Sequence, residues 1–362
     1  MTMIRLPGMV DAHVHLRAPG APHKESVSSG TAAALAGGVI AVLDMPNTRP
    51  PTTDSETLRA KQALFADQAL CDYGLFLGFD GTHLQPLAQL ADSAVGLKLY
   101  LDETFGDLLT SEPRALAQVF EMWPGPGTIA VHASSESIAV ALDLARRYHQ
   151  HLHVCHVPHP DDLLAIDRAR QAGVNVTCEV TPHHLFLSTD DAARLGAFGR
   201  MKPPLVTLDL VQRFWDRLDL VDIVASDHAP HTREEKASQN PPPGVPGLET
   251  TLPLLLWAVH KDRLTADRMR DLVVEGPLRV YGLAAPADTW INVDMSEPYR
   301  LSGNGYTTRC GWSPFAGLDA IGRVVRVQLR GQTVWENQRV LASPGYGQTL
   351  QRGCEATDTE GE

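Results

Sequence analysis

Residues 9–15 of the chain read MVDAHVH, an apolar run that ends in His-Val-His. Seven further β-rich runs follow it, and helical stretches alternate with them. The eight runs lie at residues 9–15, 39–45, 71–79, 94–101, 128–133, 152–157, 174–180 and 221–227. Strands that alternate with helices form a parallel sheet, and eight such units in series predict an α/β fold of the closed (β/α)8 TIM-barrel type.

The first strand-to-helix turn separates this barrel from its rival, a doubly wound open sheet. A doubly wound sheet normally carries a glycine-rich fingerprint at that turn, whereas this chain has His-Val-His there. We therefore favour the barrel, over residues 9–288. Reactive side chains of such a barrel gather at the carboxyl ends of its strands.

The pattern changes after the eighth strand. Residues 252–260 and 265–275 are expected to be helical, whereas residues 322–329 and 333–340 alternate like an antiparallel hairpin. We expect residues 1–8 and 289–349 to form a small β-rich appendage, in which the hairpin pairs with the N-terminal segment. Residues 350–362, which end in GCEATDTEGE, are expected to be a disordered tail.

Composition narrows the range of partners. The chain has 362 residues, with 31 Lys and Arg against 43 Asp and Glu, a net charge of −12 that disfavours nucleic acid and anionic membranes. No signal peptide and no apolar run long enough to span a bilayer is recognised. Five cysteines without a CxxC pair indicate a reduced compartment. We expect a cytoplasmic protein that acts on a small molecule.

Metal-binding residue types stand at the ends of several predicted strands. His13 and His15 are two residues apart, so both point to one face of their strand. His132 lies at the end of the fifth strand, His156 at the end of the sixth and Asp227 at the end of the eighth. Imidazoles and a carboxylate that converge at one end of a barrel suit zinc or a similar divalent ion.

Lys98 lies at the end of the fourth predicted strand. An isolated lysine there would extend its charge to solvent. A buried lysine near cations loses its proton more easily, and the neutral amine can take up carbon dioxide to become an anionic carbamate. Such a carbamate could bridge two metals. The two sets of ligands would be His13, His15 and Asp227 on one side and His132 and His156 on the other.

Eight motifs, taken as a set, resemble the dihydroorotases of the amidohydrolase superfamily. They are HVHLR (13–17), DMPNTRPP (44–51), GLKLYL (96–101), VHAS (131–134), CHV (155–157), TPHHLFLS (181–188), SDHAPHT (226–232) and PGLETTLPLLL (246–256). The short lead before HVH and the sequence KLYLDETF (98–105) are especially similar to the dihydroorotase domain of the animal multifunctional pyrimidine-synthesis protein. The similarity extends to residue 348.

The resemblance implies a zinc-dependent enzyme that reversibly cyclises N-carbamoyl-L-aspartate to L-dihydroorotate in pyrimidine biosynthesis. It assigns one zinc to His13, His15 and Asp227, a second to His132 and His156, and a carboxylated Lys98 as the bridge. A hydroxide held between the metals would attack the ring amide, and Asp227 would move the proton.

Further residues match the family's substrate site. Arg17, Asn47 and His231 match those that hold the substrate's remaining carboxylate, through a guanidinium fork, an amide and a ring N–H. Without the resemblance, Asn47 could equally be a turn residue. Thr104 and Phe105 match a loop that closes over the substrate in the animal-type domain.

Cys155 and Glu179 match residues that accompany an additional zinc in the animal-type domain. Strand alternation argues against that third metal, because the adjacent Cys155 and His156 should face opposite ways unless the strand is bulged. Because the resemblance and the strand geometry disagree, three zinc ions remain an alternative to two.

The chain also departs from the animal-type pattern. Lys202 stands where that domain has an arginine, so a bidentate contact becomes a single point charge. The sequence HAS (132–134) lacks the acidic residue often found after this histidine. His183 and His184 are expected to pack or to support a ligand.

Two alternatives to a dihydroorotase remain open. Another cyclic amidase, such as an allantoinase or a dihydropyrimidinase, would share the metals but would not need all three carboxylate-binding residues. A catalytically silent homologue that serves as a scaffold for aspartate transcarbamoylase would usually lack ligands, whereas this chain keeps all six. The expected partners are a small-molecule substrate, a second copy in a homodimer and aspartate transcarbamoylase, without nucleic acid or membrane.

Overall fold

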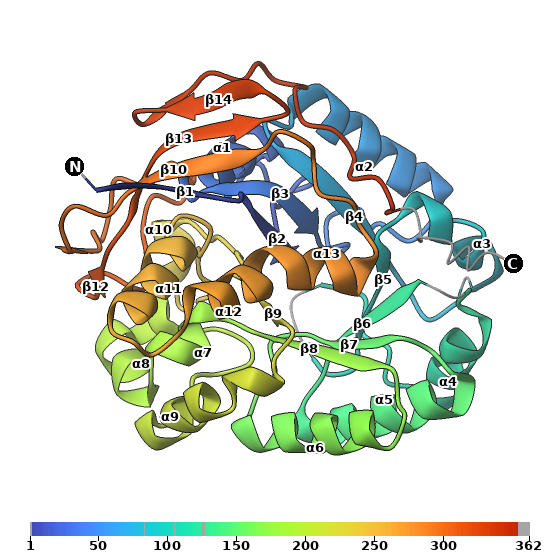
Figure 1. The fold of residues 1–362 in the computed structure, drawn as a ribbon. Coiled ribbons are helices and arrows are strands. Elements are labelled where there is room, and N and C mark those ends of the chain that lie inside the picture. Colours follow the sequence, from blue (N-terminus) through green and yellow to red (C-terminus); the bar gives the residue numbers. More distant parts are fainter. Residues whose placement is uncertain (1, 83, 104–105, 125–126, 354–362) are drawn as a thin grey trace, which may run out of the picture.

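The computed structural model describes residues 2–82, 84–103, 106–124 and 127–353. Eight parallel strands in the order β2 to β9 form one sheet that curls into a barrel (Figure 1). They are β2 (Met9–Val14), β3 (Val39–Asp44), β4 (Asp72–Gly78), β5 (Gly96–Tyr100), β6 (Thr128–His132), β7 (Leu152–Val154), β8 (Val176–Val180) and β9 (Ile223–Val224). Each lies within one of the eight predicted runs, so the predicted barrel is confirmed.

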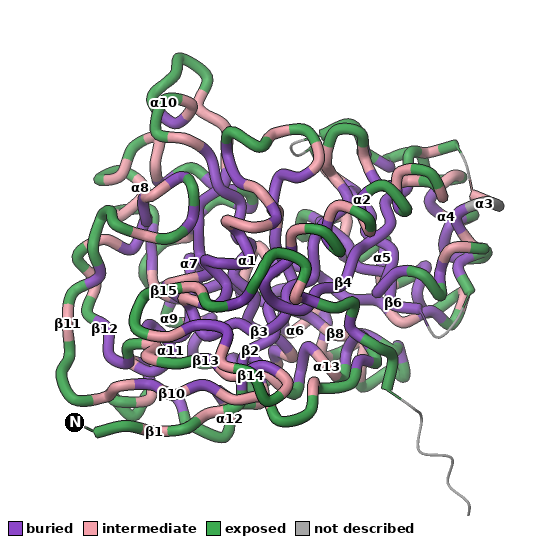
Figure 2. Tube along the Cα trace, turned by 90° about the horizontal axis from the view of Figure 1, so that it is seen from above, coloured by how far each residue is buried: buried purple, intermediate pink, exposed green. Residues whose placement is uncertain are grey.

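The barrel strands are buried on both faces. In β3, for example, all of VIAVLD is buried. Side chains fill the inside of the barrel while helices cover its outside, which explains why these runs are continuously apolar instead of alternating. Buried residues accordingly concentrate in the centre of the molecule, and exposed residues lie on the outer helices and loops (Figure 2).

The barrel closes between β2 and the segment that follows β9. The N–H of His15 donates to the carbonyl of His228 at 2.8 Å, and Val14 and His228 form a parallel bridge. Asp11 reinforces this closure, because its Oδ1 accepts the N–H groups of His13 at 3.2 Å and Ser226 at 3.1 Å. Burial raises the pKa of Asp11 to about 6. The two ends of the barrel sheet are thereby fixed beside each other.

Helices surround the barrel (Figure 1). They are α1 (Val27–Ala36), α2 (Ser55–Gln68), α3 (Leu84–Ala88), α4 (Pro113–Met122), α5 (Ser135–Tyr148), α6 (Pro160–Gln171), α7 (Pro182–Phe186), α8 (Thr189–Leu195), α9 (Leu208–Asp216), α10 (Arg233–Lys236), α11 (Thr251–His260), α12 (Ala266–Arg270) and α13 (Gly276–Tyr281). Polar caps define their ends: Ser134 accepts the N–H of Ser137 at the start of α5. Among the described helices, none has the length and apolar character needed to cross a bilayer.

An antiparallel sheet built from both ends of the chain lies beside the barrel (Figure 1). Its strands, in spatial order, are β1 (Met3–Leu6), β10 (Trp290–Asp294), β13 (Arg323–Leu329), β14 (Gln332–Glu336) and β15 (Arg339–Val340). The predicted hairpin is β13 with β14, and β10 joins it to the N-terminal strand. A separate short ladder pairs β11 (Tyr299–Arg300) with β12 (Asp319–Ala320).

Residues 350–353 pack on the barrel, where a tail was expected. The N–H of Leu350 donates to the carbonyl of Tyr73 at 2.8 Å, and the N–H of Gly353 donates to that of Gly282 at 2.9 Å. These backbone hydrogen bonds keep the chain in place beyond residue 349, and composition alone does not reveal them. Residues 354–362 lie outside the described residues.

Candidate active site

One cavity lies at the carboxyl ends of the barrel strands and collects most of the predicted site residues. Its lining residues are His13, His15, Arg17, Asn47, Tyr100, His132, His156, Lys202, Asp227, Ala229, Pro243 and Gly244. They come from separate parts of the chain that only the closed barrel brings together. Predicted metal ligands and predicted substrate contacts therefore share one cavity.

His13 lies between two carboxylates. Its Nδ1 is 2.5 Å from Oε1 of Glu179, and its Nε2 is 3.5 Å from Oδ1 of Asp227. Burial opposes the protonation of His13, but the two carboxylates outweigh it and raise the pKa to about 10. Burial would raise the pKa of Glu179 and Asp227, yet His13 holds both well below their usual range. A divalent cation could replace the His13 proton as the charge that neutralises these carboxylates.

His15 is oriented by Asn47. The Nδ1 of His15 is 2.8 Å from Oδ1 of Asn47, and its Nε2 is 3.2 Å from Oδ1 of Asp227. An amide oxygen only accepts hydrogen bonds, so the proton of a neutral His15 belongs on Nδ1 and the lone pair on Nε2. Burial lowers the pKa of His15 to about 4, which keeps it neutral. A neutral imidazole with one available lone pair is the form that binds metals.

His132 and His156 form a second pair. The Nδ1 of His132 is 2.9 Å from Nε2 of His156. Burial lowers the pKa of His132 to about 3 and holds that of His156 well below its usual range, so both rings are neutral. Nδ1 of His156 is buried and has no hydrogen-bond partner in the described part of the chain. Buried polar atoms are rarely left in this state, and a bound cation would relieve it.

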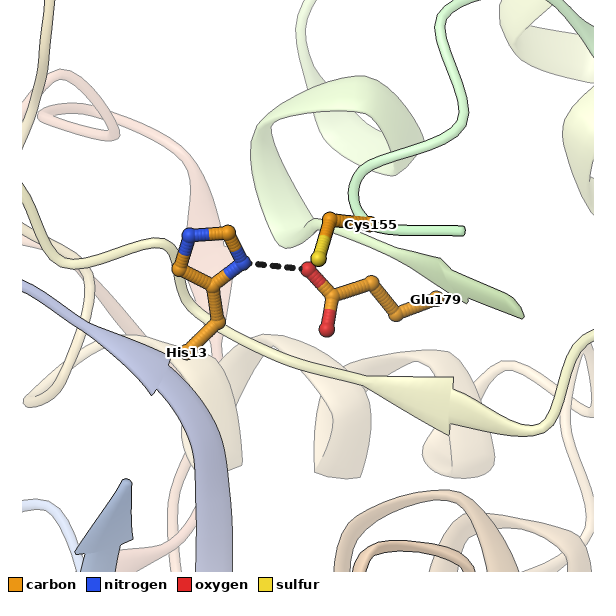
Figure 3. A group of neighbouring side chains, drawn as sticks. All are labelled: His13, Cys155 and Glu179. Atoms are coloured by element: carbon orange, nitrogen blue, oxygen red, sulfur yellow. Dashed lines mark hydrogen bonds and ion pairs between the residues drawn. The ribbon is translucent and has the colours of Figure 1, made fainter. Parts of the chain in front are cut away.

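Cys155 and His156 both face this centre, although they are adjacent in sequence. Sγ of Cys155 can join His13 and Glu179 in one group of ligand atoms within 4.8 Å of one another, and His156 can join His13 and Asp227 in another. Figure 3 shows the first group. The exception to strand alternation applies here, because β7 ends at Val154 and His156 takes a left-handed φ of 30°. A residue with such a φ no longer has the backbone geometry of a strand, so its side chain does not follow strand alternation.

Arg17 and Asp227 share this unusual backbone, with φ values of 60° and 45°. Positive φ is costly for residues other than glycine and often accompanies functional sites. A wholly buried ion pair supports the Arg17 turn: Nζ of Lys61 is 2.6 Å from Oδ2 of Asp44, whose Oδ1 accepts the N–H of Leu16 at 2.7 Å. The aspartate of the DMPN motif thus fixes the backbone between His15 and Arg17.

Lys98 is fully buried and lies close to both groups of ligand atoms. Its Nζ is 2.7 Å from Sγ of Cys155. After burial, its charge is among the causes that lower the pKa of His132 and His156. The side chain of Lys98 therefore does not extend to solvent. Its position suits a group that links the two sets of ligands.

Arg17 lines the cavity and contacts His231, which is fully buried and is not itself among the lining residues. Nε of Arg17 donates to the carbonyl of Pro230 at 3.1 Å, and its NH2 nitrogen is 3.1 Å from Nε2 of His231. The Nε2 of His231 is also 3.0 Å from the carbonyl of Pro243, and its Nδ1 is 3.3 Å from Nζ of Lys24. Burial, followed by Arg17 and Lys24, holds the pKa of His231 well below its usual range. His231 is therefore neutral, and its Nε2 lies near both a donor, Arg17, and an acceptor, the carbonyl of Pro243.

Lys236 joins the two loops that contribute Lys202 and Gly244 to the cavity lining. Its Nζ is fully buried and donates to the carbonyls of Arg200, Pro242 and Gly244 at 3.0 to 3.1 Å. Two loops that line the cavity are thus held by one ammonium group. Lys202, on the first of these loops, is exposed and donates from Nζ to the carbonyl of Glu103 at 2.8 Å.

Two of the predicted substrate contacts cannot be placed. Thr104 and Phe105, expected in a closing loop, lie outside the described residues. Just before them, Asp102 accepts hydrogen bonds from the N–H of Ser134 at 2.5 Å and from its hydroxyl at 3.2 Å. A carboxylate from a different loop therefore bonds the HAS segment, which has no acidic residue of its own.

His153 is a further buried residue beside the predicted ligands. Its Nε2 is 3.2 Å from Oε2 of Glu179, and its Nδ1 is 2.9 Å from Oγ1 of Thr177. His153 precedes Cys155 by two residues, and this spacing is the sequence signal for a shared face. His184 instead packs, with Nδ1 2.9 Å from Oγ1 of Thr181 and Nε2 3.3 Å from the carbonyl of Pro204.

Sequence comparisons relate the chain to dihydroorotases. Residues 2–106 match a family model described as dihydro-orotase-like. The chain is 44% identical over 350 residues to multifunctional protein pyr1-3 of Dictyostelium discoideum, an alignment that covers 96% of this chain but 16% of that protein. It is 34% identical to a dihydroorotase of Halobacterium salinarum, with 94% of this chain and 88% of that one covered. The chain thus spans about a sixth of the multifunctional relative.

Solved structures share the architecture. The L-hydantoinase (dihydropyrimidinase) of Arthrobacter aurescens superposes with a TM-score of 0.91 at 26% identity, over 96% of this chain and 89% of that one. An inactive dihydroorotase-like domain from the CAD-like multifunctional protein of Chaetomium thermophilum gives 0.81 at 22% identity, over 97% and 100%, which shows the fold alone. The alignment to the Halobacterium protein covers most of both chains and is accompanied by the family-model match. The chain belongs to the dihydroorotase family.

Proposed function

We propose that the protein is a zinc-dependent dihydroorotase that interconverts N-carbamoyl-L-aspartate and L-dihydroorotate in pyrimidine biosynthesis. The observation that carries this proposal is a single cavity whose lining combines two kinds of chemistry. It contains imidazoles and a carboxylate together with Arg17 and Asn47. Such a cavity suits a substrate that carries both a hydrolysable amide and a carboxylate.

The donor set fits two zinc ions. Protein zinc sites use neutral imidazoles, ionised carboxylates and residues that orient the ligands, as Asn47 orients His15. His15, His132 and His156 are neutral, and a zinc ion would displace the proton of His13. His13, His15 and Asp227 would hold one ion and His132 and His156 the other, with Lys98 as the bridging carbamate. When bound, the zinc ions would activate water and polarise the carbonyl under attack.

Asp227 is the residue placed to move protons. Its pKa is held low, so it is ionised across the neutral range. During hydrolysis it can take a proton from the attacking water and return it to the ring nitrogen as the amide bond breaks. The other proton of the water leaves with the new carboxyl group, which ionises. Cyclisation runs these transfers in reverse.

Arg17, Asn47 and His231 would bind the carboxylate that both reactants keep. Arg17 can offer two parallel N–H groups to it. The oxygen of Asn47 accepts from His15, so its NH2 is the part that can donate to substrate. The local cations also favour an anionic substrate on a protein whose net charge is −12.

The group formed by His13, Cys155 and Glu179 would accept a third ion, as an alternative to the two-zinc centre. Replacement of Cys155 by serine should then lower the zinc content by one per chain and leave much of the activity. Metal analysis of the purified variant measures this, with Cys178→Ser, at another buried thiol, as the matched control. Unchanged zinc content in Cys155→Ser would reduce Cys155 to a packing residue.

The proposed function predicts a reversible, metal-dependent reaction. Purified protein should convert both compounds, lose this activity when zinc is removed by a chelator and regain it when zinc is restored. Because cyclisation consumes a proton, the equilibrium ratio of dihydroorotate to carbamoyl aspartate should fall about tenfold per pH unit above the carboxylate pKa. Activity that survives complete zinc removal, or a ratio that ignores pH, contradicts the proposal.

We also propose an association with other enzymes of pyrimidine synthesis, aspartate transcarbamoylase among them. The alignment of 96% of this chain within a multifunctional protein supports it. The homodimer expected from the resemblance remains a prediction.

A further inference from the structure

Tyr100 lines the cavity, and the mechanism above does not use its hydroxyl group. Tyr100 is the last residue of β5 and lies two residues after Lys98, so the two share a face of the strand. It lines the same cavity as His13, Arg17 and Asp227. Only 3% of its surface is exposed.

The hydroxyl of Tyr100 is buried and has no hydrogen-bond partner in the part of the chain that the structure describes. Buried hydroxyl groups nearly always have a partner, since the loss of water is otherwise uncompensated. A tyrosine that lines a substrate cavity can obtain this partner from the substrate. The missing bond is then a property of the free enzyme.

Tyr100 can act as a donor. A phenol has an ordinary pKa of about 10, so the hydroxyl carries its proton at neutral pH. Its ring centre is 6.1 Å from that of His132 and 5.5 Å from Nζ of Lys98, so it stands next to both a predicted ligand and the predicted bridge.

We propose that the hydroxyl of Tyr100 donates a hydrogen bond to an oxygen of the bound substrate, which makes Tyr100 a further catalytic residue. This inference rests on the proposed function, because it takes dihydroorotate or carbamoyl aspartate as the ligand. Both compounds carry only acceptor oxygens on their carboxylate and amide carbonyls. A protonated tyrosine in the same lining as Arg17 is complementary to them.

Tyr281 provides a matched control inside the same molecule. It is 4% exposed, and its hydroxyl also lacks a partner among the described residues. Its ring packs against Phe76 at 5.4 Å and His153 at 5.6 Å between ring centres, and it is not part of the cavity lining. Comparison of the two tyrosines therefore separates contact with substrate from the loss of a buried hydroxyl.

The test is the pair Tyr100→Phe and Tyr281→Phe in zinc-loaded protein. Tyr100→Phe should lower kcat/KM for dihydroorotate by about tenfold to a hundredfold at unchanged zinc content, whereas Tyr281→Phe should stay within about twofold. A rise in KM would place the bond in the bound ground state, and a fall in kcat would place it in the transition state. Calorimetric binding of orotate, an unreactive ring with the same carboxylate, gives a readout that needs no turnover.

The outcomes separate the two proposals. If Tyr100→Phe keeps both its kcat/KM and its affinity for orotate within about twofold of wild type, the role of Tyr100 is refuted and the proposed function stands. An equal loss in Tyr281→Phe also refutes it. If the wild-type protein neither converts dihydroorotate nor binds orotate, the proposed function fails, and the role of Tyr100 fails with it.

Discussion

Replacement of Lys98 by alanine is expected to remove most of the bound zinc and to lower dihydroorotate turnover by at least about a hundredfold. Lys98 is wholly buried, and its charge acts on His13 in one predicted set of ligands and on His132 and His156 in the other. Its loss would leave two neighbouring cations without the anion between them. Short carboxylic acids that fit the space should restore part of both properties. Zinc analysis and kinetics on the same sample, with and without acetate or propionate, measure this.

Lys61→Ala is the matched control for this experiment. Lys61 is also fully buried, but its partner is Asp44 and not a predicted metal ligand. Removing one half of a buried ion pair should lower the free energy of unfolding by roughly 3–5 kcal/mol. Because every predicted zinc ligand remains in the chain, the folded Lys61→Ala protein should bind more zinc than Lys98→Ala. Full zinc content and normal turnover in Lys98→Ala would refute the bridging role.

Replacement of Arg17 by methionine is expected to lower kcat/KM for dihydroorotate by roughly two orders of magnitude or more. Loss of one donor leaves the substrate carboxylate partly unpaired in a buried site, which costs roughly 2–5 kcal/mol. Zinc content should stay near that of wild type. A ring without the carboxylate, such as dihydrouracil, should be affected far less.

Kinetics with both substrates measure this change in preference. Arg300→Met is the control, because Arg300 lies on β11 with 78% of its side chain exposed and should leave both rates unchanged. A variant Arg17→Met that keeps the wild-type preference for dihydroorotate would show that Arg17 does not bind the carboxylate.

Much of the fold is predictable because one physical rule acts locally. Each barrel strand is buried on both faces, so each appears in the sequence as an apolar run, and β3 with VIAVLD is the clearest case. The end of a strand is harder to predict. Residues 152–157 form one β-rich run in the sequence, yet β7 ends at Val154 and the backbone turns at His156. That turn depends on contacts with other strands.

The candidate site is likewise predictable in part: its strand-end residues can be found from sequence, but the contacts between distant segments cannot. His13, His15, His132, His156 and Asp227 could be grouped from sequence because a barrel brings its strand ends together. The bond between Asn47 and His15 and the support of the HAS segment by Asp102 join residues that are 32 positions apart. In the sequence, Tyr100 resembles any other apolar residue of a buried strand. Its place in the cavity lining is known only from the structure.

The most direct measurement is the specificity of the zinc-loaded wild-type protein for dihydroorotate, dihydrouracil and hydantoin. It decides between the proposed activity and that of the L-hydantoinase whose structure superposes so closely. The carboxylate-free rings would leave Arg17, Asn47 and His231 without their ligand, so kcat/KM for dihydroorotate should exceed the other two by at least about a hundredfold. Equal or faster hydrolysis of dihydrouracil or hydantoin, or no hydrolysis of dihydroorotate at all, would contradict the assignment.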